Sequence, residues 1–589
     1  MRVKVESYIP LTKWLFLLVA CVVGLPPLSA DPPEPLFLPR KHEVRAVWLT
    51  TVKGLDWPKT RAVSAESRKR QQQELIDILD DLQAANINTV MLQTRVRGNL
   101  IYPSQYETWS EVFTGKAGED PGYDLLAFAV EECHKRGMEL HAWIVTFPLG
   151  SKEVQRDLQG KSVVKRQPRL VKRFRDNWYL NPGHPETKYY LASLVRELIS
   201  RYDVDGVHFD YIRYPDRPRR FPDAADFKRY REPGEELADW RRRNITEIVR
   251  HLYHEVKQLK PWVKVSSAPL GKYRDTRRYP SRGWNAYHAV YQEAQVWMKE
   301  GVQDMIFPML YYRGNDFYPF VLDWQEQSEG RVVVPGLGIY FLDPSEGTWT
   351  LADVEQQLNF IRWAGVSGEA HFRSQFLTDR RLGLYDRVKR DYYYTKALLP
   401  AMPWLDSIAP STPSSGELVR SADGVTLQWA AGSDDTQGGV CYNIYASAVY
   451  PVDTDNPHHL LAARWRDTLY THILPLPSSA PLHYYAVTTM DRCGNESAPL
   501  QLGGGEAVGD APADGAFNLL PVCDGVVELP HIPEAVQVIL ADGCGRKVAQ
   551  VPYHRRLKLT KLPAGFYRAV VVDNKGRTYV TNAFINRKK

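Results

Sequence analysis

The segment that decides the fold is a unit of strand, helix and strand near the start of the chain. It reads VRAVWLTT over residues 44–51, SRKRQQQELIDILDDLQAA over 67–85 and TVMLQTR over 89–95. The outer runs are short and rich in β-branched and aromatic residues, whereas the middle run spaces its leucines three to four residues apart. This pattern predicts two parallel strands joined by a crossover helix.

The same alternation repeats between residues 43 and 400. Eight runs have the pattern of buried strands: Val44–Thr51, Thr89–Arg95, Leu140–Thr146, Gly206–Ile212, Val263–Leu270, Met305–Tyr312, Val332–Phe341 and Gly368–Ser374. Eight segments have helical periodicity: Ser67–Ala85, Tyr123–Arg136, Pro185–Arg201, Glu235–Leu259, Ala286–Glu300, Tyr318–Glu329, Leu351–Trp363 and Gly383–Leu398. We therefore expect an α/β fold, a closed (β/α)₈ TIM barrel. An open doubly wound sheet would need a glycine-rich phosphate turn after the first strand, and residues 50–54 do not form one.

Shifts in composition and stretches rich in proline, glycine and serine divide the chain into five parts. The protein has 589 residues, 44% hydrophobic and 24% charged, with a net charge of +6, which is ordinary globular composition and excludes a disordered or fibrous protein. We expect a signal peptide over residues 1–30, the barrel over 31–402, a β-sandwich over 403–502, a linker over 503–514 and a small β-domain over 515–589.

The N-terminus predicts export. Residues 14–25 are apolar, but twelve residues fall short of the ~20 that a membrane-spanning helix needs. Basic residues precede this run and small residues follow it, so a signal peptide cleaved near Ala30 is expected, with no transmembrane span. The alternative is a lipid anchor at Cys21, because residues 18–21 resemble a lipobox. Either signal places the mature protein in the periplasm or on the outer cell surface.

The remaining five cysteines are too sparse for a disulfide scaffold and lack the spacing of a zinc site. One disulfide could form after export, within Cys523/Cys544 or within Cys441/Cys493. Cys133 lies in a helical pattern and is expected to be a buried packing residue.

The run DGVHFDYIRYP at residues 205–215 contains the leading catalytic candidate. His208 and Asp210 share one strand face, so Asp210 should point into the top of the barrel with His208 one layer below. Reacting groups of such barrels lie at the carboxyl ends of the strands. The structural alternative for Asp210 is an ion pair with Arg213 or Arg95.

Several strings, in order along the barrel, resemble the glycosyl-hydrolase-like 10 family. They are residues 45–49 (RAVWL), 55–58 (LDWP), 93–98 (QTRVRG), 109–116 (WSEVFTGK), 121–124 (PGYD), 140–143 (LHAW), 180–183 (LNPG) and the segment of Asp210. The resemblance implies a barrel glycoside hydrolase, with activity in the family on the glycan strands of peptidoglycan. Asp210 matches the first acid of the fourth-strand motif, and Tyr211 stands where many members carry a second Asp. The C-terminal parts also resemble known modules: residues 485–497 a fibronectin type III domain, and residues 515–589 the sorting domain of the type IX secretion system.

Hydrolysis of a glycosidic bond normally takes two carboxyl groups. Asp316 and Glu111 lead as partners of Asp210, and Asp56, Glu107 and Asp343 are further candidates near strand ends. Asp304 and Glu369 begin their strands and are assigned structural roles, because the amino-terminal face of a barrel serves stability.

A second group of residues is expected at the top of the barrel, where they could hydrogen-bond to sugars or stack on them. These substrate-binding candidates are Asp56, Trp57, Arg95, Arg97, Trp109, His141, Trp143, Asn181, His208, Tyr211, Arg213, Tyr311, Tyr312 and Tyr340. His141 is as readily an interior histidine. His141 and His208 lack a third ligand, so neither a metal nor another cofactor is expected.

Charge gives a clue to the substrate. Residues 152–176 hold nine Lys and Arg against three acids, and residues 213–231 hold seven against three. Both clusters follow barrel strands, so they could attract an acidic glycan, peptidoglycan or another acidic polysaccharide, although a solvated basic loop has the same pattern. Export and the lack of a recognised module argue against nucleic acid. The alternative function is a non-catalytic carbohydrate-binding or scaffold protein on a degenerate barrel, and the oligomeric state is left open.

Overall fold

The computed structural model describes residues 38–158, 162–279, 283–421, 424–436, 438–473, 484–503 and, between 519 and 585, the strands with a few flanking residues. The described residues up to Leu502 form one compact unit and those after it form a second. The predicted signal peptide and its Cys21 lie outside the described residues. No helix of the described chain is long and apolar enough to cross a membrane.

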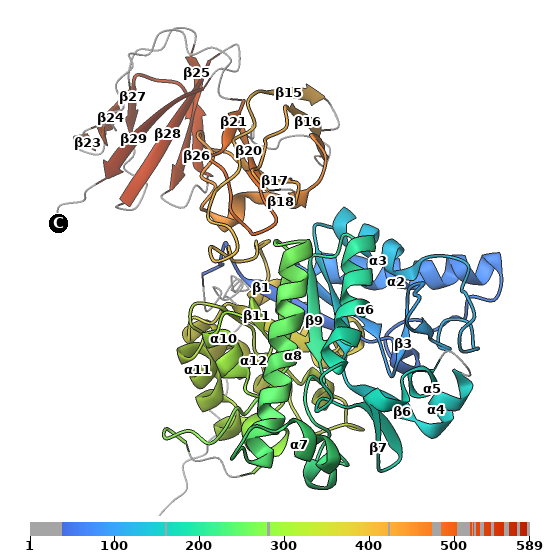
Figure 1. Cartoon of the computed structure of the whole chain (residues 1–589). Coiled ribbons are helices and arrows are strands. Elements are labelled where there is room, and N and C mark those ends of the chain that lie inside the picture. Colours follow the sequence, from blue (N-terminus) through green and yellow to red (C-terminus); the bar gives the residue numbers. More distant parts are fainter. Residues whose placement is uncertain are drawn as a thin grey trace, which may run out of the picture. The chain divides into compact units, whose positions relative to one another are not determined.

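Eight parallel β segments form the sheet of the first unit (Figure 1). They are β1 (Val44–Leu49), β2 (Thr89–Arg95), β5 (Glu139–Val145), β9 (Gly206–Asp210), β10 (Lys264–Ser267), β11 (Met305–Ile306), β12 (Val332–Val333) with β13 (Gly336–Leu337), and β14 (Gly368–Phe372). Neighbours pair in that order, and β14 pairs with β1. β12 pairs with β11 and β13 with β14, so both ends of the sheet lie in one short segment. The predicted strand order is confirmed, and we call this sheet with its helices the barrel.

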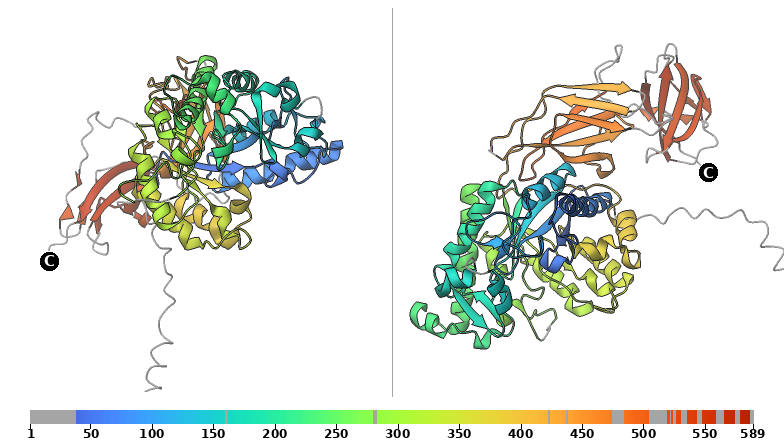
Figure 2. Two further views of the ribbon diagram at one scale, coloured as in Figure 1. Left: turned by 60° about the horizontal axis from the view of Figure 1, so that its bottom comes forward. Right: turned by 90° about the vertical axis from the view of Figure 1, so that its right-hand side faces the viewer.

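Helices cover the outer side of the strands (Figure 2). They are α2 (Ala65–Ala84), α3 (Leu125–Lys135), α6 (Thr187–Arg201), α8 (Leu237–Leu259), α9 (Ala286–Ala289), α10 (Ala294–Lys299), α11 (Tyr318–Glu326), α12 (Leu351–Trp363), α13 (Ser374–Thr378) and α14 (Leu384–Arg387). α2 begins at a capping box in which Ser64 and Ser67 exchange hydrogen bonds, and its leucines are buried against the strands.

Two predicted helices differ from the structure. The segment 286–300 divides into α9 and α10 because Gln292 turns inward, where its amide accepts from Leu270 N and donates to Ile212 O. The segment 383–398 loses its helical form after Tyr392, because Tyr393 is buried and its hydroxyl donates to Glu369. In both cases a buried polar contact outweighs local helical propensity.

Long excursions follow two of the strands. After β5 come β6 (Pro148–Ser151), α4 (Lys152–Asp157), α5 (Val163–Arg166), β7 (Val171–Phe174) and β8 (Asn177–Leu180), and β8 pairs antiparallel with both β6 and β7. After β9 comes α7 (Ala224–Tyr230). These excursions carry the basic residues that the sequence analysis singled out.

The described chain continues into two antiparallel sheets. One contains β15 (Gly416–Ser421), β16 (Gly424–Trp429) and β19 (Leu469–Ile473), and the other β18 (Leu460–Trp465), β17 (Cys441–Ser447), β20 (Tyr484–Met490) and β21 (Leu500–Leu502). Both contribute to one apolar cluster that includes Leu427, Ile444 and Val487. We call this part the sandwich, and its identity as a fibronectin type III domain stays a prediction. Cys133, Cys441 and Cys493 are buried free thiols, so Cys441 and Cys493 do not form the disulfide considered above.

Buried charges join the sandwich to the amino-terminal ends of the barrel strands. Arg464 Nη1 lies 2.9 Å from Glu139 Oε1, and its Nη2 lies 2.7 Å from Asp205 Oδ1. Lys264 Nζ donates to the same Glu139 oxygen at 2.8 Å, and Arg492 Nη2 to Asp205 at 3.1 Å. The carboxylates of Glu139 and Asp205 are fully buried and offset by these cations.

The second unit contains two further sheets. The first has the strand order β22 (Leu519–Leu520), β29 (Thr578–Ile585), β28 (Gly565–Asp573), β25 (Ala535–Asp542), β26 (Lys547–Pro552). The other contains β23 (Val522–Cys523), β24 (Val526–Glu528) and β27 (Arg556–Lys558). A small β-domain is therefore present after the linker, and its role as a sorting domain stays a prediction.

Candidate active site

Asp210 is the last residue of β9 and lies, as expected, at the carboxyl end of the strand. Its side chain is only 6% exposed. Oδ2 accepts a hydrogen bond from Trp143 Nε1 at 3.2 Å, and Oδ1 accepts one from Tyr211 N at 2.6 Å. Burial raises the pKa of Asp210 to about 6, against the opposing effects of Arg213 and of these two donors. A carboxyl with this pKa can both donate and accept a proton near neutral pH.

His208 lies one layer below Asp210, as the strand alternation predicts. Trp48 Nε1 donates to His208 Nε2 at 3.1 Å, and Nδ1 lies 2.9 Å from Ser266 Oγ. Because an indole N–H can only donate, Nε2 accepts and Nδ1 carries the proton. Burial holds the pKa of His208 well below its usual range, so the ring is neutral and acts as packing beneath the acid.

Aromatic side chains form a wall beside the acid. The ring of Tyr311 lies 5.3 Å from that of Phe372 and 5.9 Å from that of Tyr340, between ring centres. Burial and the nearby charge of Asp210 raise the pKa of Tyr311. Such faces pack against sugar rings. Phe372, the last residue of β14, was missed as a site residue, because an apolar residue at a strand end gives no chemical signal in sequence.

The chain turns sharply directly after the acid. Tyr211 adopts φ +50, in the left-handed region that non-glycine residues rarely occupy, and it is 41% exposed. The guanidinium of Arg213 lies 4.6 Å from the centre of the Tyr211 ring and 5.7 Å from that of Trp284. Trp284 is also 42% exposed and was not predicted, since it follows a loop with no strand pattern.

The two candidate partner acids lie apart from these contacts. Asp316 Oδ1 accepts from Lys272 Nζ at 2.8 Å, and its side chain is 47% exposed. Glu111 is exposed and accepts from Asn99 Nδ2 at 3.2 Å. Within the described residues, no hydrogen bond or ion pair joins either acid to Asp210.

Several other predicted residues build the loops around the site. Asp56 is buried, accepts from Thr50 N at 2.8 Å and pairs with Arg373, which ties the loop after β1 to the one after β14. Arg95 is buried and pairs with Glu107 at 2.6 Å. Its guanidinium also donates to the Thr146 carbonyl oxygen at 2.9 Å.

The remaining predicted substrate-binding residues are either buried in the core or half-buried near the surface. Asn181 is buried and donates to Asp226 Oδ2 at 3.1 Å, Trp57 and Trp109 belong to the core, and His141 contacts Glu139 at 3.0 Å inside the barrel. Arg97 is half-buried, as is Tyr312, whose ring centre lies 5.1 Å from Lys272 Nζ.

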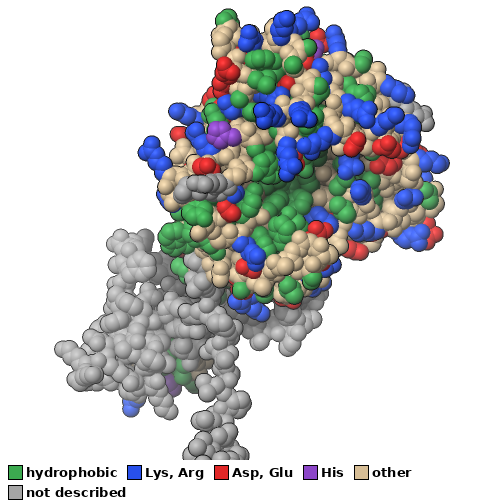
Figure 3. Space-filling model, turned by 90° about the horizontal axis from the view of Figure 1, so that it is seen from below, with side chains coloured by type: hydrophobic (Ala, Val, Ile, Leu, Met, Phe, Trp, Pro, Cys, Tyr) green, Lys and Arg blue, Asp and Glu red, His purple; other side chains and the backbone are tan. Residues whose placement is uncertain are grey.

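Figure 3 looks onto the face of the barrel that bears α7 and the β6–β8 lobe, and it shows a hollow with a hydrophobic floor, surrounded by many Lys and Arg side chains and fewer Asp and Glu side chains. The exposed cations of the two excursions include Lys165, Arg166, Arg169, Arg173, Arg175, Arg217, Arg219, Arg220, Lys228, Arg229 and Arg231. The carboxyl ends of β5 and β9 therefore meet a positively charged rim.

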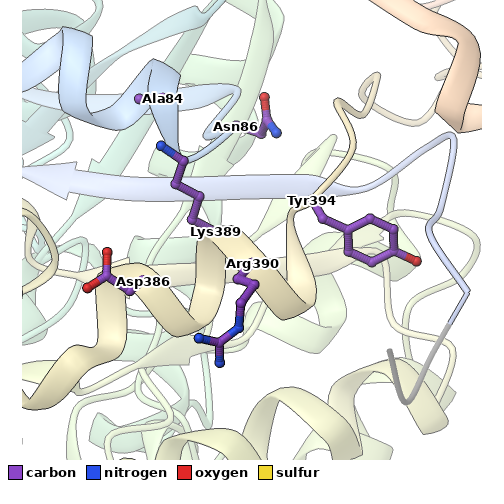
Figure 4. A pocket seen from close by; sticks show the side chains of 6 residues that line it. All are labelled: Ala84, Asn86, Asp386, Lys389, Arg390 and Tyr394. Atoms are coloured by element: carbon purple, nitrogen blue, oxygen red, sulfur yellow. The ribbon is translucent and has the colours of Figure 1, made fainter. Parts of the chain in front are cut away.

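A separate surface hollow of about 530 Å³ does not belong to this site (Figure 4). It is lined by Ala84, Asn86, Asp386, Lys389, Arg390 and Tyr394. Asn86 precedes β2, so this hollow lies by the amino-terminal ends of the strands.

Comparison with known proteins bears on the barrel and its site. A family model described as "Glycosyl hydrolase-like 10" matches residues 43–340. The chain belongs to this family. "Glycosyl hydrolase YngK" of Bacillus subtilis is 31% identical over 477 residues, covering 77% of this chain and 92% of that protein. "Glycosyl hydrolase DigH" of Escherichia coli is 36% identical over 326 residues, covering 50% of this chain and 74% of that protein.

Membership of the glycosyl hydrolase-like 10 family confirms the resemblance seen in the sequence. Among solved structures, the PgaB (BpsB) glycoside hydrolase domain from Bordetella bronchiseptica is 14% identical, with a TM-score of 0.43 over 59% of this chain and 98% of that one. The family match ends at residue 340, before β14, which carries Phe372.

Proposed function

We propose that the protein is an exported glycoside hydrolase that cleaves the glycan strands of peptidoglycan or of another acidic polysaccharide, with Asp210 as its general acid and base. The observation that carries this proposal is a buried carboxyl with a pKa of about 6 beside an aromatic wall, at the carboxyl end of β9. Membership of a glycosyl hydrolase-like family supports the reaction class.

The chemistry follows from the two states of Asp210. In its protonated form the carboxyl donates a proton to the glycosidic oxygen as the bond to the anomeric carbon breaks. In its ionised form it accepts a proton from the incoming water or sugar hydroxyl. The hydrogen bonds from Trp143 and Tyr211 hold both carboxyl oxygens, so the group keeps one orientation in either state.

For the second carboxyl we propose Asp316, with Glu111 as the alternative. Asp316 is held by Lys272, which follows β10, and burial together with the nearby charge of Asp316 raises the pKa of the Tyr312 phenol. Tyr312 directly follows Tyr311 of the aromatic wall. Glu111 instead lies in the loop that follows β3 (Asn99–Leu100) and β4 (Thr108–Trp109).

The test is hydrolysis of purified glycan strands from which the peptides have been removed. Wild type should release new reducing ends, and Asp210→Asn should lower turnover at least ~100-fold while its circular dichroism stays unchanged. Asp316→Asn and Glu111→Gln, assayed in parallel, identify the partner as the variant with a comparable loss. Tight binding of the strands without any product from wild type would instead favour a carbohydrate-binding scaffold.

Acidity of the substrate is supported by the basic rim around the hollow in Figure 3. A rim of one sign raises the local concentration of a polyanion, and its effect falls as salt screens the charges. The rate on an acidic strand should therefore fall between 0.05 and 0.5 M NaCl, as roughly expected from screening lengths, whereas the rate on a neutral oligosaccharide should not.

We also propose that residues 1–30 direct export and that residues 515–589 carry a sorting signal. Alternating strands in the second unit are compatible with such a domain. Mass spectrometry of the mature N-terminus separates cleavage near Ala30 from lipidation at Cys21. Deleting residues 515–589 in the native host should move the protein from its usual cell fraction, and an unchanged location would leave only an accessory β-domain.

A further inference from the structure

Arg213 combines burial with an incomplete set of partners. Its side chain is 5% exposed, yet its carboxylate partner Asp216 is 58% exposed and is held by one hydrogen bond of 2.7 Å. The Nε atom of Arg213 is buried and has no hydrogen-bond partner among the described residues. Nη1 makes one further contact, a long one of 3.4 Å to the Tyr214 carbonyl oxygen.

Two buried arginines elsewhere in the barrel have a paired carboxylate, although Arg45 and Arg362 each also have a buried nitrogen without a hydrogen-bond partner among the described residues. Arg95 binds Glu107 through Nε at 2.7 Å and Nη2 at 2.6 Å, and both side chains are buried. Arg241 binds Asp223 in the same two-pronged way, at 2.8 and 2.6 Å. A buried cation is stable when a carboxylate offsets it through two bonds, and Arg213 lacks that second bond in the described chain.

Two partly exposed aromatic rings and the carboxyl of Asp210 lie near Arg213. Its guanidinium lies against the rings of Tyr211 and Trp284, each about two-fifths exposed. Arg213 is also close enough to Asp210 to lower the pKa of that carboxyl. Because the guanidinium lies over these rings, a sugar would stack on the faces that it leaves open, next to Asp210, whose Oδ1 accepts a hydrogen bond from Tyr211 N.

We propose that Tyr211, Arg213 and Trp284 form the subsite that recognises a carboxylate-bearing sugar next to the scissile bond. The sugar ring packs on the exposed aromatic faces, and its carboxylate accepts hydrogen bonds from Arg213, taking over from the exposed Asp216. The proposal rests on the proposed hydrolase function and narrows its substrate class to sugars with a free carboxylate at this position.

The experiment compares one glycan strand in two forms, with its sugar carboxylates free and with the same groups converted to neutral amides. Wild type should show a kcat/KM at least about 10-fold lower on the amidated strand, the effect expected from losing a hydrogen bond to a charged group. Arg213→Gln should lose a similar factor on the free strand and cleave both forms at similar rates. Arg213→Lys should retain part of the preference.

Two further variants test whether the effect is specific to Arg213 and its aromatic neighbours. Arg390→Gln removes the same charge from an exposed position outside the basic rim and should keep the preference of wild type. Trp284→Ala changes an exposed side chain, so it should fold normally even if Arg213→Gln does not, and it should raise KM on the free strand at least about threefold, as loss of a stacking contact predicts.

Equal cleavage of both strands by wild type, or an undiminished preference in Arg213→Gln, would overturn the proposal. If neither wild type nor any variant cleaves either strand, the proposed hydrolase function is wrong, independently of the subsite. Calorimetric binding of the same two strands to wild type and Arg213→Gln then decides the subsite, and binding without a preference for the free carboxylate overturns it.

Discussion

At the scale of the residue, the proton affinity of Asp210 is a balance of opposing contacts. Burial raises its pKa to about 6, while Arg213 and the donors Tyr211 N and Trp143 Nε1 favour the ionised form. If the protonated form is the general acid, kcat/KM should fall as the pH rises through this pKa. A variant that removes one of these contacts should therefore move the pH at which kcat/KM falls.

The Trp143→Phe variant tests this balance. Loss of the Nε1 donor removes a hydrogen bond that stabilises the carboxylate, so the pKa of Asp210 should rise and the alkaline fall in kcat/KM should move to higher pH. The measurement is a pH–rate profile from pH 4 to 9. Trp363→Phe, at an exposed position of α12, is the matched control and should leave the profile in place. A movement to lower pH would contradict the assignment.

Residue types and strand alternation were enough to predict that Asp210 lies at the carboxyl end of a strand with His208 one layer below it, and that Tyr311 follows another strand. They could not predict the partners, because hydrogen bonds between residues far apart in the chain leave no local trace. Arg95 and Asp56 are polar residues at strand ends, as a catalytic group would be, and the structure shows them holding Glu107 and Arg373. Trp284, which contacts Arg213, was also not predicted, because its loop has no periodic pattern.

At the scale of the element, strand existence was predictable and helix continuity was less so. All eight strand runs are present because parallel strands buried on both faces read as continuous apolar segments. The segment 286–300 has good helical spacing, but Tyr291 adopts φ +59 and Gln292 turns inward, and both divide the segment into α9 and α10. Helical periodicity cannot predict that a glutamine turns inward, because its hydrogen-bond partners, Ile212 O and Leu270 N, are distant in the sequence.

The second residue of β14, Glu369, carries a carboxyl group whose pKa is strongly displaced. Burial, together with the neighbouring Glu43, raises the pKa of Glu369 to about 7, although Arg362 and Arg45 oppose the shift and the Tyr393 hydroxyl donates to it. Because the folded state holds this proton more tightly than the unfolded chain, the stabilisation is complete below about pH 4.5, the ordinary value. It is lost as the pH rises through about 7.

Glu369→Gln should therefore flatten the pH dependence of stability. Between pH 5 and pH 8 the free energy of unfolding should decrease less in the variant than in wild type, because glutamine cannot ionise. Urea unfolding at the two pH values measures this difference. Glu346→Gln, at an exposed position, should behave as wild type does, and a steeper decrease in Glu369→Gln would show that the carboxylate is the stabilising form.

At the scale of the whole molecule, the barrel and the sandwich share buried charge. Arg464 bridges Glu139 and Asp205, and Arg492 adds a second contact to Asp205. A carboxylate left buried without its cation is costly, so these contacts should couple the stability of the two parts. The sequence predicted the boundary near residue 403 but not this coupling, because Arg464 and Glu139 lie more than 300 residues apart.

Arg464→Gln should destabilise the first unit by about 3–5 kcal/mol, the usual cost of removing one partner of a buried ion pair. Arg466→Gln is the control, because Arg466 pairs at 2.8 Å with the half-exposed Asp203 and should cost less than about 1 kcal/mol. Guanidinium unfolding followed by tryptophan fluorescence gives both values. Similar values for the two variants would mean that the buried carboxylates find other partners or water.

The strand β9 is constrained from both ends. Asp205, immediately before it, is fastened to the sandwich, and Asp210, at its end, carries the proposed proton transfer, with four residues between them. Conservative substitution of the apolar Val207 or Phe209 can be absorbed by repacking, but a change in the number of residues between the two aspartates cannot. One inserted residue would turn either the anchor or the acid to the opposite side of the sheet. In the evolution of this chain, therefore, the distance between these two aspartates should be harder to change than the identity of the residues that separate them.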